Sequence, residues 1–378
     1  MSNSDDAAGS TESTVSVIDV GAAPQTPALI NGAVWIANFD VGTVMVVDPT
    51  TQRIVNTIEV GDGPVTPVFA AGSVWIANQL EGTLTQVDPV TAEVVAVLTV
   101  GAEPGVPAVV NGQLWVPNLA GGNISRVDPL AGDVVGTIVV QQRPSTPVVG
   151  AGSVWVANEW SSTVSQIDAD TGTVLATIPV GILPQQPLVV GGQVFVANVD
   201  GGTLTVIDVA DLSRSTVDLG SGSQPQKPVY DGSTIWIPLF GASALAPLDP
   251  ATGTVGDFVG VDPNPLTPLY DGAYLWVPNE ASSVQQVDAA TRAVLKTFPI
   301  DFAAGGRLSY RAGRVRRRCG SPAASIPVLP LSAMPRLRAQ VCPPTRPTTT
   351  RWRRRPRHPW PTTVARPGPS IENFRSSS

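Results

Sequence analysis

The sequence predicts an all-β fold assembled from repeated four-stranded units, and two observations carry this prediction. A large aromatic residue recurs at intervals of 40 or 41 residues, at Trp35, Trp75, Trp115, Trp155, Phe195, Trp236 and Trp276. An acidic residue keeps step with it, at Asp48, Asp88, Asp128, Asp168, Asp208, Asp249 and Asp288. A fixed period of about 40 residues with four strands per unit is typical of β-propeller blades. We therefore predict a β-propeller of seven complete blades.

Residues 154–181 show the unit most clearly: VWVANEWSSTVSQIDADTGTVLATIPVG. Short runs rich in Val, Ile, Thr and Trp alternate with Asn, Asp and Gly, which is the pattern of strands separated by turns. Helical repeats of similar period are the competing interpretation. They need long stretches of 3.6-residue periodicity, whereas Gly or Pro interrupts this chain every few residues.

The N-terminus comes first in chain order. Residues 1–13 are polar and acidic, which predicts a disordered linker. Residues 14–21 (TVSVIDVG) match the last strand of a repeat, such as NTIEVG at 56–61. We expect this orphan strand to complete the last blade and so tie the chain ends together by backbone hydrogen bonds. The propeller is then predicted over residues 14–306.

Each blade follows one plan. Its first strand opens with a proline pair, such as Pro24 and Pro27, and because proline cannot donate to a ladder this should be the inner edge strand at the channel. A two-residue turn such as Asn31-Gly32 follows. The second strand carries the aromatic and is apolar on both faces, as expected if blades stack face to face. The third ends at the recurring Asp, predicted to form a turn, and the fourth is outermost.

Residues 307–378 differ from the rest in composition. They hold 16 of the 23 Lys and Arg residues, both cysteines (Cys319 and Cys342) and the single histidine, His358, but only one acidic residue, Glu372. An eighth unit begins after Ile300 and then gives way to a Pro-, Arg- and Ser-rich run. We expect an irregular tail after about Val315, read as an out-of-frame remnant of an eighth blade. A functional basic arm is the alternative, and eight blades remain possible in an intact ancestor.

The charge of the propeller body limits its partners. Residues 1–306 carry seven basic and 29 acidic residues, a formal charge of −22. Such a body should repel nucleic acid and anionic membranes. No run of 18 apolar residues is present, so we expect no transmembrane segment, and no secretory signal segment is recognisable. We expect a monomer.

The repeat VWVAN followed by STVSQIDADTGTVLATIPVG resembles the YVTN β-propeller repeat, with Trp and Ala where that family often has Tyr and Thr. The resemblance covers about residues 14–300 and implies a propeller located outside the cytoplasm. The chain also resembles the streptogramin lyases, whose chemistry would imply a catalytic histidine with a metal. The body contains no His or Cys, which argues against that role and against zinc or copper sites.

A polar ring at the inner-strand entrance is the predicted binding site. It comprises Thr26, Thr66, Val106, Thr146, Gln186, Lys227 and Thr267, with Lys227 its only basic member. Adjoining loops contribute Phe39, Asp40, Glu81, Glu159, Trp160, Asp200 and Glu280. Trp160 is the one Trp of residues 1–306 outside the core series, where it is either a contact anchor or a partly buried loop residue.

These features predict a non-enzymatic protein, without cofactor, that presents an acidic, polar face to a protein, glycan or small ligand. The alternative is a metal-dependent hydrolase or lyase of lactonase type that uses channel carboxylates. A cluster of inward-facing Glu, Asp and Asn residues would favour the enzyme. The recurring Asp and Asn residues are instead interpreted as turn formers, and the aromatic series as core between blades.

Overall fold

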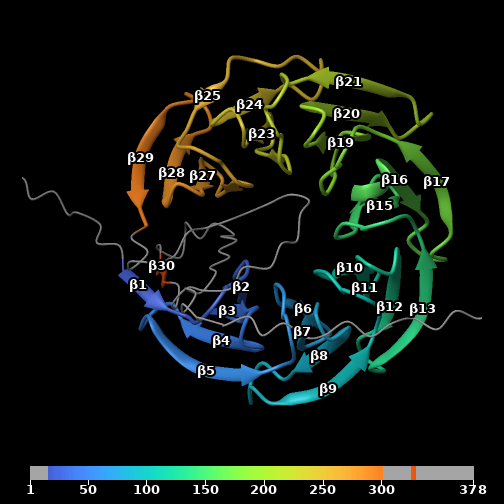
Figure 1. The fold of residues 1–378 in the computed structure, drawn as a ribbon, viewed down its shortest axis with the longest axis vertical. Coiled ribbons are helices and arrows are strands. Elements are labelled where there is room, and N and C mark those ends of the chain that lie inside the picture. The colour runs from blue at the N-terminus through green and yellow to red at the C-terminus, as the bar shows by residue number, and fades with distance from the viewer. Residues whose placement is uncertain (1–15, 301–324, 329–378) are drawn as a thin grey trace, which may run out of the picture. The chain divides into compact units, whose positions relative to one another are not determined.

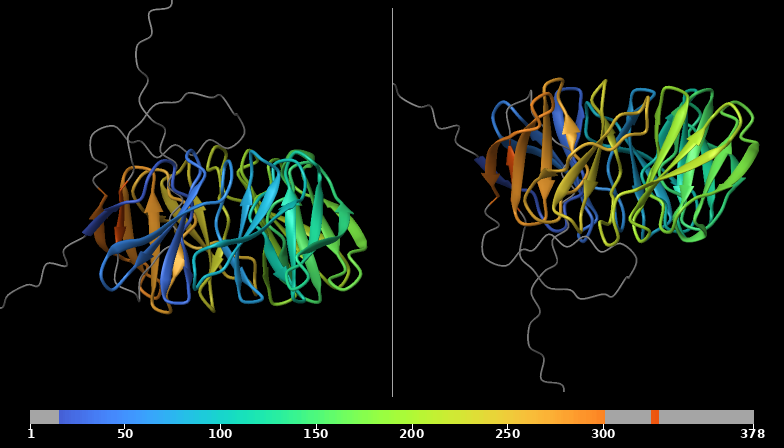
Figure 2. Two further views of the ribbon diagram at one scale, coloured as in Figure 1. Left: turned by 90° about the horizontal axis from the view of Figure 1, so that it is seen from below. Right: turned by 90° about the horizontal axis from the view of Figure 1, so that it is seen from above.

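The structure, a computed structural model, describes residues 16–300 and 325–328. Seven antiparallel four-stranded sheets follow one another around a common axis, as Figure 1 shows. Seen from the side in Figure 2, the connecting loops gather at the two ends of the strands. The predicted seven-bladed β-propeller is therefore confirmed.

Within each blade the four strands are arranged in chain order from the axis to the rim. The innermost are β2 (Ala28–Ile30), β6 (Val68–Ala70), β10 (Ala108–Val110), β14 (Val148–Gly150), β18 (Leu188–Val190), β22 (Val229–Tyr230) and β26 (Leu269–Tyr270). The second strands are β3 (Ala33–Asn38), β7 (Ser73–Asn78), β11 (Gln113–Asn118), β15 (Ser153–Asn158), β19 (Gln193–Asn198), β23 (Ile235–Leu239) and β27 (Tyr274–Asn279).

The third strands are β4 (Thr43–Asp48), β8 (Thr83–Val87), β12 (Asn123–Asp128), β16 (Thr163–Ile167), β20 (Thr203–Asp208), β24 (Ala244–Leu248) and β28 (Ser283–Asp288). The outer strands are β5 (Arg53–Glu59), β9 (Val94–Thr99), β13 (Asp133–Val139), β17 (Val174–Pro179), β21 (Arg214–Asp218), β25 (Val259–Gly260) and β29 (Val294–Pro299). A single 3-10 turn, η1 (Glu159–Ser161), follows β15 within the part of the chain that the structure describes.

The core lies between blades. Second strands are buried on both faces, and in β7 the residues from Val74 to Ala77 have no exposed surface. Trp35 of the first blade packs in one cluster with Val74 and Ile76 of the second, and the other aromatics are buried in equivalent clusters. Removing one such aromatic should cost about 3–5 kcal/mol of folding free energy.

Turn chemistry matches the sequence pattern. Asn31 and Gly32 have φ angles of 50° and 80°, which is the left-handed pair that a two-residue hairpin requires. Asp48 accepts hydrogen bonds from the backbone N–H of Thr50 and from the Thr51 hydroxyl, each 2.8 Å long. The hydrogen bonds from the Thr51 side chain and the Thr50 backbone hold the pKa of Asp48 below its ordinary value. The prediction that the Asp series forms turns is confirmed.

The N-terminal strand pairs differently from the prediction. β1 (Ser16–Asp19) forms a separate two-stranded antiparallel sheet with β30 (Ser325–Val328), while the last blade is completed by its own β29. The expectation that β1 completes the last blade is wrong. β29 follows β28 through a short turn, so its pairing closes a much shorter loop than β1 would. The expectation of a wholly irregular tail is also wrong at Ser325–Val328; the linker at 1–13 and the rest of the tail lie outside the described residues.

The chain next to β1 nevertheless joins the first and last blades. Val20 is fully buried in a cluster that contains Val34 of the first blade and Trp276 of the last. Ile300, just beyond β29, belongs to the same cluster, and Ile18 packs against it. The residues on either side of the propeller sequence therefore contribute apolar surface to the junction where the ring closes.

Candidate functional site

A four-residue segment Pro-X-X-Pro, in which X varies, directly precedes each inner strand, as Pro24 to Pro27 precede β2. The hydrogen bonds of this segment determine which of its residues faces the axis. The first X donates its N–H to the second strand, as Gln25 does to the carbonyl of Ala37 over 2.7 Å and Ser145 to that of Ala157 over 2.7 Å. Successive residues of an extended chain turn their backbone groups to opposite edges. The second X therefore lies with its backbone groups toward the axis.

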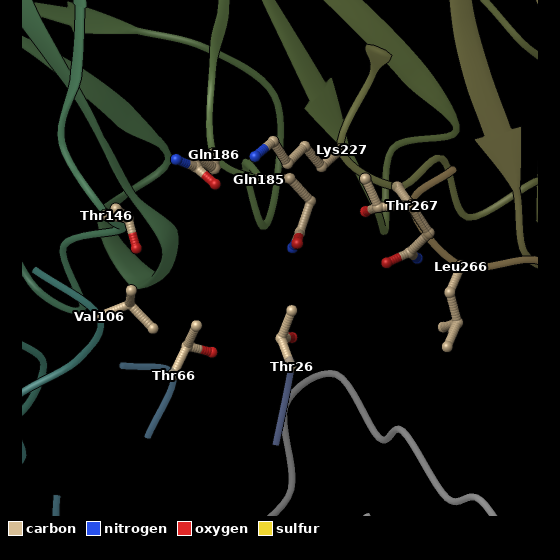
Figure 3. A pocket seen from close by; sticks show the side chains of 10 residues that line it. Thr26, Thr66, Val106, Thr146, Gln185, Gln186, Lys227, Leu266 and Thr267 are labelled. Carbon is tan, nitrogen blue, oxygen red and sulfur yellow. The ribbon is translucent and has the colours of Figure 1, made fainter. Parts of the chain in front are cut away.

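The second X residues of all seven blades line one pocket with a volume of about 150 Å³. Figure 3 shows their side chains around it. They are the predicted ring of Thr26, Thr66, Val106, Thr146, Gln186, Lys227 and Thr267. The structure thus brings the predicted ring together in one place, and its role in binding stays a prediction.

Three further residues complete the lining: Gln185, Gln226 and Leu266. Each directly precedes a ring residue, so the first X of these three blades also reaches the pocket. Gln226 is buried and donates from Nε2 to the carbonyl of Gln224, 3.1 Å away, which fixes its amide. No periodic signal marks these residues in the sequence, because the first X is Val65 or Gly105 in other blades.

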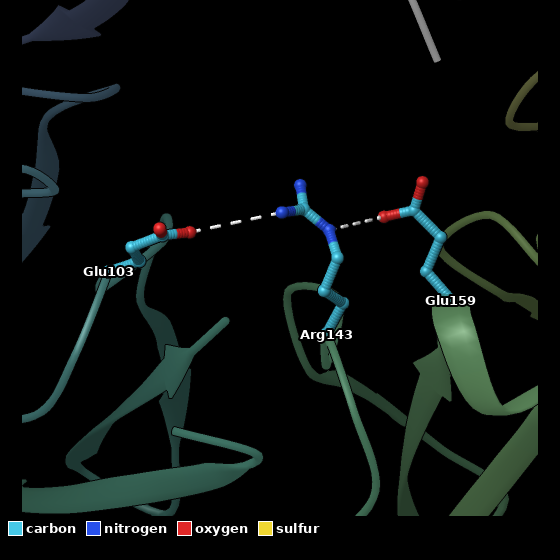
Figure 4. Close-up of polar contacts among 3 residues, drawn as sticks. All are labelled: Glu103, Arg143 and Glu159. Atoms are coloured by element: carbon cyan, nitrogen blue, oxygen red, sulfur yellow. Dashed lines mark hydrogen bonds and ion pairs between the residues drawn. The ribbon is translucent and has the colours of Figure 1, made fainter. Parts of the chain in front are cut away.

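Trp160 lies outside this pocket lining, on the loop after β15, and this residue is 58% exposed. The guanidinium carbon of Arg143 lies 4.8 Å from the centre of the indole ring. Arg143 in turn binds Glu159 through Nε at 3.0 Å and approaches Glu103 at 3.8 Å, as Figure 4 shows. The arginine thus stacks on one side of the indole while two carboxylates hold the arginine in place.

Sequence reasoning found Trp160 and Glu159 but missed Arg143 and Glu103. Both occupy the position just before the first proline of their blade, and both have positive φ angles, 52° and 53°. The corresponding residues of other blades include Ala23 and Gly63, so the position looked like a simple turn. The acidic loop residues predicted beside the mouth lie outside the pocket lining.

The recurring Asn residues form a buried polar network. Asn118 donates from Nδ2 to Oδ1 of Asn123 at 2.7 Å and to Oγ of Ser125 at 2.9 Å. The amide packs against the closing glycine of the preceding repeat, where a Cβ added at Gly101 would stand 2.5 Å from Cγ of Asn118. These Asn residues lie at strand ends, as expected, but their side chains bond across the sheet to the next strand rather than within a turn.

Among the described residues, no three His, Cys, Asp or Glu side chains lie close enough together to hold a metal ion. The pocket lining itself contains Thr, Gln, Val, Leu and Lys. It therefore lacks the carboxylates that calcium or magnesium takes as ligands. In the same part of the chain, no helix is long and apolar enough to cross a membrane.

No protein-family model and no curated protein matches the chain. Solved structures do resemble it. A catalytically inactive form of virginiamycin B lyase from Staphylococcus aureus, solved with quinupristin, is 13% identical with a TM-score of 0.56, over 70% of this chain and 95% of the enzyme. The computationally designed Ika8 protein is 14% identical with a TM-score of 0.66, over 78% and 92% of the two chains.

Two further structures show how varied these neighbours are. The dihydro-heme d1 dehydrogenase NirN is 16% identical with a TM-score of 0.63, over 74% of this chain and 66% of that one. BamB from Moraxella catarrhalis is 14% identical with a TM-score of 0.56, over 66% and 79%. Proteins of different function thus share the architecture. The resemblance to the YVTN repeat stays a prediction, and the comparisons show that this chain has the β-propeller fold.

Proposed function

We propose that this chain is a non-enzymatic binding protein whose binding surface is the propeller face that carries the ring of Pro-X-X-Pro segments. One observation carries the proposal: seven segments, about 40 residues apart in sequence, converge on one pocket, and six of them deliver a polar side chain into it, without a carboxylate among the ten described lining residues. A concave site with convergent polar groups is the usual form of a ligand site. By the family resemblance, we place the protein outside the cytoplasm.

Trp160 supports this choice of face. Pro144 and Asn158 form an antiparallel β-bridge. Thr146 lies two residues after Pro144 and Trp160 two residues after Asn158, so both belong to the same end of the fourth blade. Trp and Arg residues at the centre of protein interfaces carry much of the binding energy. An exposed indole already held by Arg143 can stack on a partner without first losing rotamer freedom.

A thermal-shift screen tests the proposal. The full chain is heated with members of a library of peptides, saccharides and metabolites, alongside the double variant Thr66→Val/Thr146→Val. We expect at least one compound to raise the unfolding midpoint of the wild type and not that of the variant, since a ligand at 100 times its Kd contributes about 2.7 kcal/mol. Thr137→Val, on an exposed outer strand, is the matched control.

The alternative, a metal-dependent hydrolase or lyase of lactonase type, is tested with the same instrument. The pocket lining offers no carboxylate, so millimolar calcium and EDTA should leave the midpoint of the full chain unchanged. A rise in midpoint with calcium that EDTA reverses would contradict the non-enzymatic proposal and make carboxylates elsewhere on the face the leading site.

A further inference from the structure

We infer that the pocket takes a neutral, hydroxyl-rich ligand, a saccharide residue, and this inference rests on the proposed function. It goes further by naming the chemical class of the ligand. Three features of the wall support it: its side chains, its backbone groups and its charge.

The side chains of the wall both donate and accept hydrogen bonds. Four of the ten lining residues are threonines, whose hydroxyls do both, and three are glutamines, whose amides do both. Sugar hydroxyls have the same dual capacity. A site of this composition can donate a hydrogen bond to a ligand hydroxyl or accept one from it. A wall of carboxylates could only accept hydrogen bonds, and a wall of arginines could only donate them.

The backbone adds a second set of groups of the same dual kind. In six blades the second X residue makes no hydrogen bond from its N–H to any residue that the structure describes; these are Thr26, Thr66, Val106, Thr146, Gln186 and Thr267. In an extended strand the N–H and C=O of one residue point to the same edge, so each donor has an acceptor beside it. The prolines that follow add no donor of their own.

This arrangement distinguishes between ligand classes. A compact anion would gain from the N–H groups and from Lys227 but would be repelled by the neighbouring carbonyls, and residues 16–300 hold 25 acidic against seven basic side chains, a formal charge of −18. A cation would meet Lys227, the one charged residue among the ten that line the pocket. A neutral polyol avoids both penalties and pairs with donors and acceptors alike.

The apolar lining suits the same ligand. Val106 and Leu266 lie in the wall between polar neighbours, where they can meet the C–H groups of a pyranose ring. The volume of about 150 Å³ leaves room for more than one water molecule, whose displacement by hydroxyls would conserve hydrogen bonds. The lining therefore offers both polar and apolar contacts to the end of a saccharide chain.

Saturation-transfer difference NMR on the full chain tests the inference. The probes are glucose, galactose, N-acetylglucosamine and maltotriose, with sodium phosphate followed by phosphorus NMR and a Gly-Ser-Gly tripeptide as the other ligand classes. The variants are Thr66→Val, Thr146→Val and their combination, with Thr137→Val as control. If Thr66→Val lowers the unfolding midpoint, Thr267→Val replaces it.

We expect at least one saccharide to bind, with about 2- to 10-fold weaker affinity in each single ring variant and no change in the control, as the loss of one neutral hydrogen bond predicts. If phosphate or the tripeptide binds in a ring-dependent way and no saccharide does, the inference is wrong while the proposed function stands. If saccharides bind equally well to the ring variants, the inference is wrong as well. If no compound in the thermal-shift library binds in a ring-dependent way, both fail.

Discussion

The Asn network of the third blade permits a sharp test, because the sixth blade has replaced the whole network with apolar residues. Asn118 pairs across the sheet with Asn123, and Ser125 lies two residues further along the same strand. In the sixth blade the equivalent residues in the same register are Leu239, Ala244 and Ala246, all buried. The two blades thus fill equivalent positions in two ways, one with hydrogen-bonded polar side chains and one with apolar side chains.

Changing Asn118 alone to Leu places the apolar residue of the sixth blade opposite the polar partners of the third. In Asn118→Leu, Oδ1 of Asn123 and Oγ of Ser125 lose the donor that lies 2.7 and 2.9 Å away, and Ser125 is only 2% exposed. An unsatisfied buried polar group costs about 1–3 kcal/mol, and the larger Leu adds overpacking. Asn123 is half-buried, and Oδ1 of Asn118, which the change removes, is a buried acceptor without a hydrogen-bond partner among the described residues. We therefore expect Asn118→Leu to lower the unfolding free energy by about 1–3 kcal/mol.

The triple variant Asn118→Leu/Asn123→Ala/Ser125→Ala should recover most of this loss. It removes both partners of each hydrogen bond that Asn118 donates, which is nearly neutral, and the two alanines make room for Leu as they do in the sixth blade. The Gly121 carbonyl also loses its bond from Asn123, but that bond is exposed, so water can replace it. Urea unfolding followed by Trp fluorescence measures both variants against wild type. If the triple variant is as unstable as the single one, or if the single variant is neutral, the two blades are not equivalent solutions and the explanation is wrong.

Three further predictions concern other parts of the propeller. Gly101→Ala should destabilise the fold by about 1–3 kcal/mol, because its Cβ would stand 2.5 Å from a buried amide, whereas Gly136→Ala, with nothing within 4 Å, should not lower the urea midpoint. Val20→Ala should cost about 2 kcal/mol in the same assay, because Val20 is fully buried where the ring closes; a neutral result would show that the junction does not need it. Burial raises the pKa of Asp231. Hydrogen bonds, of which the one from the Trp236 indole has the largest effect, lower the pKa by more than burial raises it, so the pKa in the folded chain lies below that in the unfolded chain. Asp231 therefore stabilises the fold above pH ~4 and loses this effect as pH falls through the folded pKa; acid titration of Asp231→Asn should show a shallower loss, and an unchanged titration would contradict the assignment.

Periodicity made the blades predictable. Trp, Asp and the Pro-X-X-Pro segments recur at one spacing, and each acts through local chemistry: burial between sheets, a turn, or a strand edge. The ring of second X residues followed from that periodicity together with the geometry of a propeller, in which the entrances to the inner strands share one face. Pairing between β1 and β30 did not, because it joins segments about 300 residues apart and no repeat relates them.

Residues that differ from their equivalents in the other blades, such as Arg143 and Leu239, were the least predictable. Arg143 and Glu103 occupy a turn position whose residue differs from blade to blade, so only the structure shows that Arg143 stacks on Trp160. Leu239 likewise occupies the position that Asn has in the other blades, and only the structure shows Ala244 and Ala246 on the paired strand. Both cases depend on side chains that meet across strands or loops, and single-sequence patterns do not encode such pairs.

The central claim, that the ring of second X residues binds the ligand, is tested most directly by a methyl NMR titration of the full chain labelled at threonine. Each compound that shifts the unfolding midpoint in the thermal-shift screen is added in turn, and the threonine methyl signals are followed. We predict that the signals of Thr26, Thr66, Thr146 and Thr267 move together while that of Thr137 stays in place. Shifts confined to threonines of the outer strands or of the Asp turns would contradict the claim that this ring is the binding site.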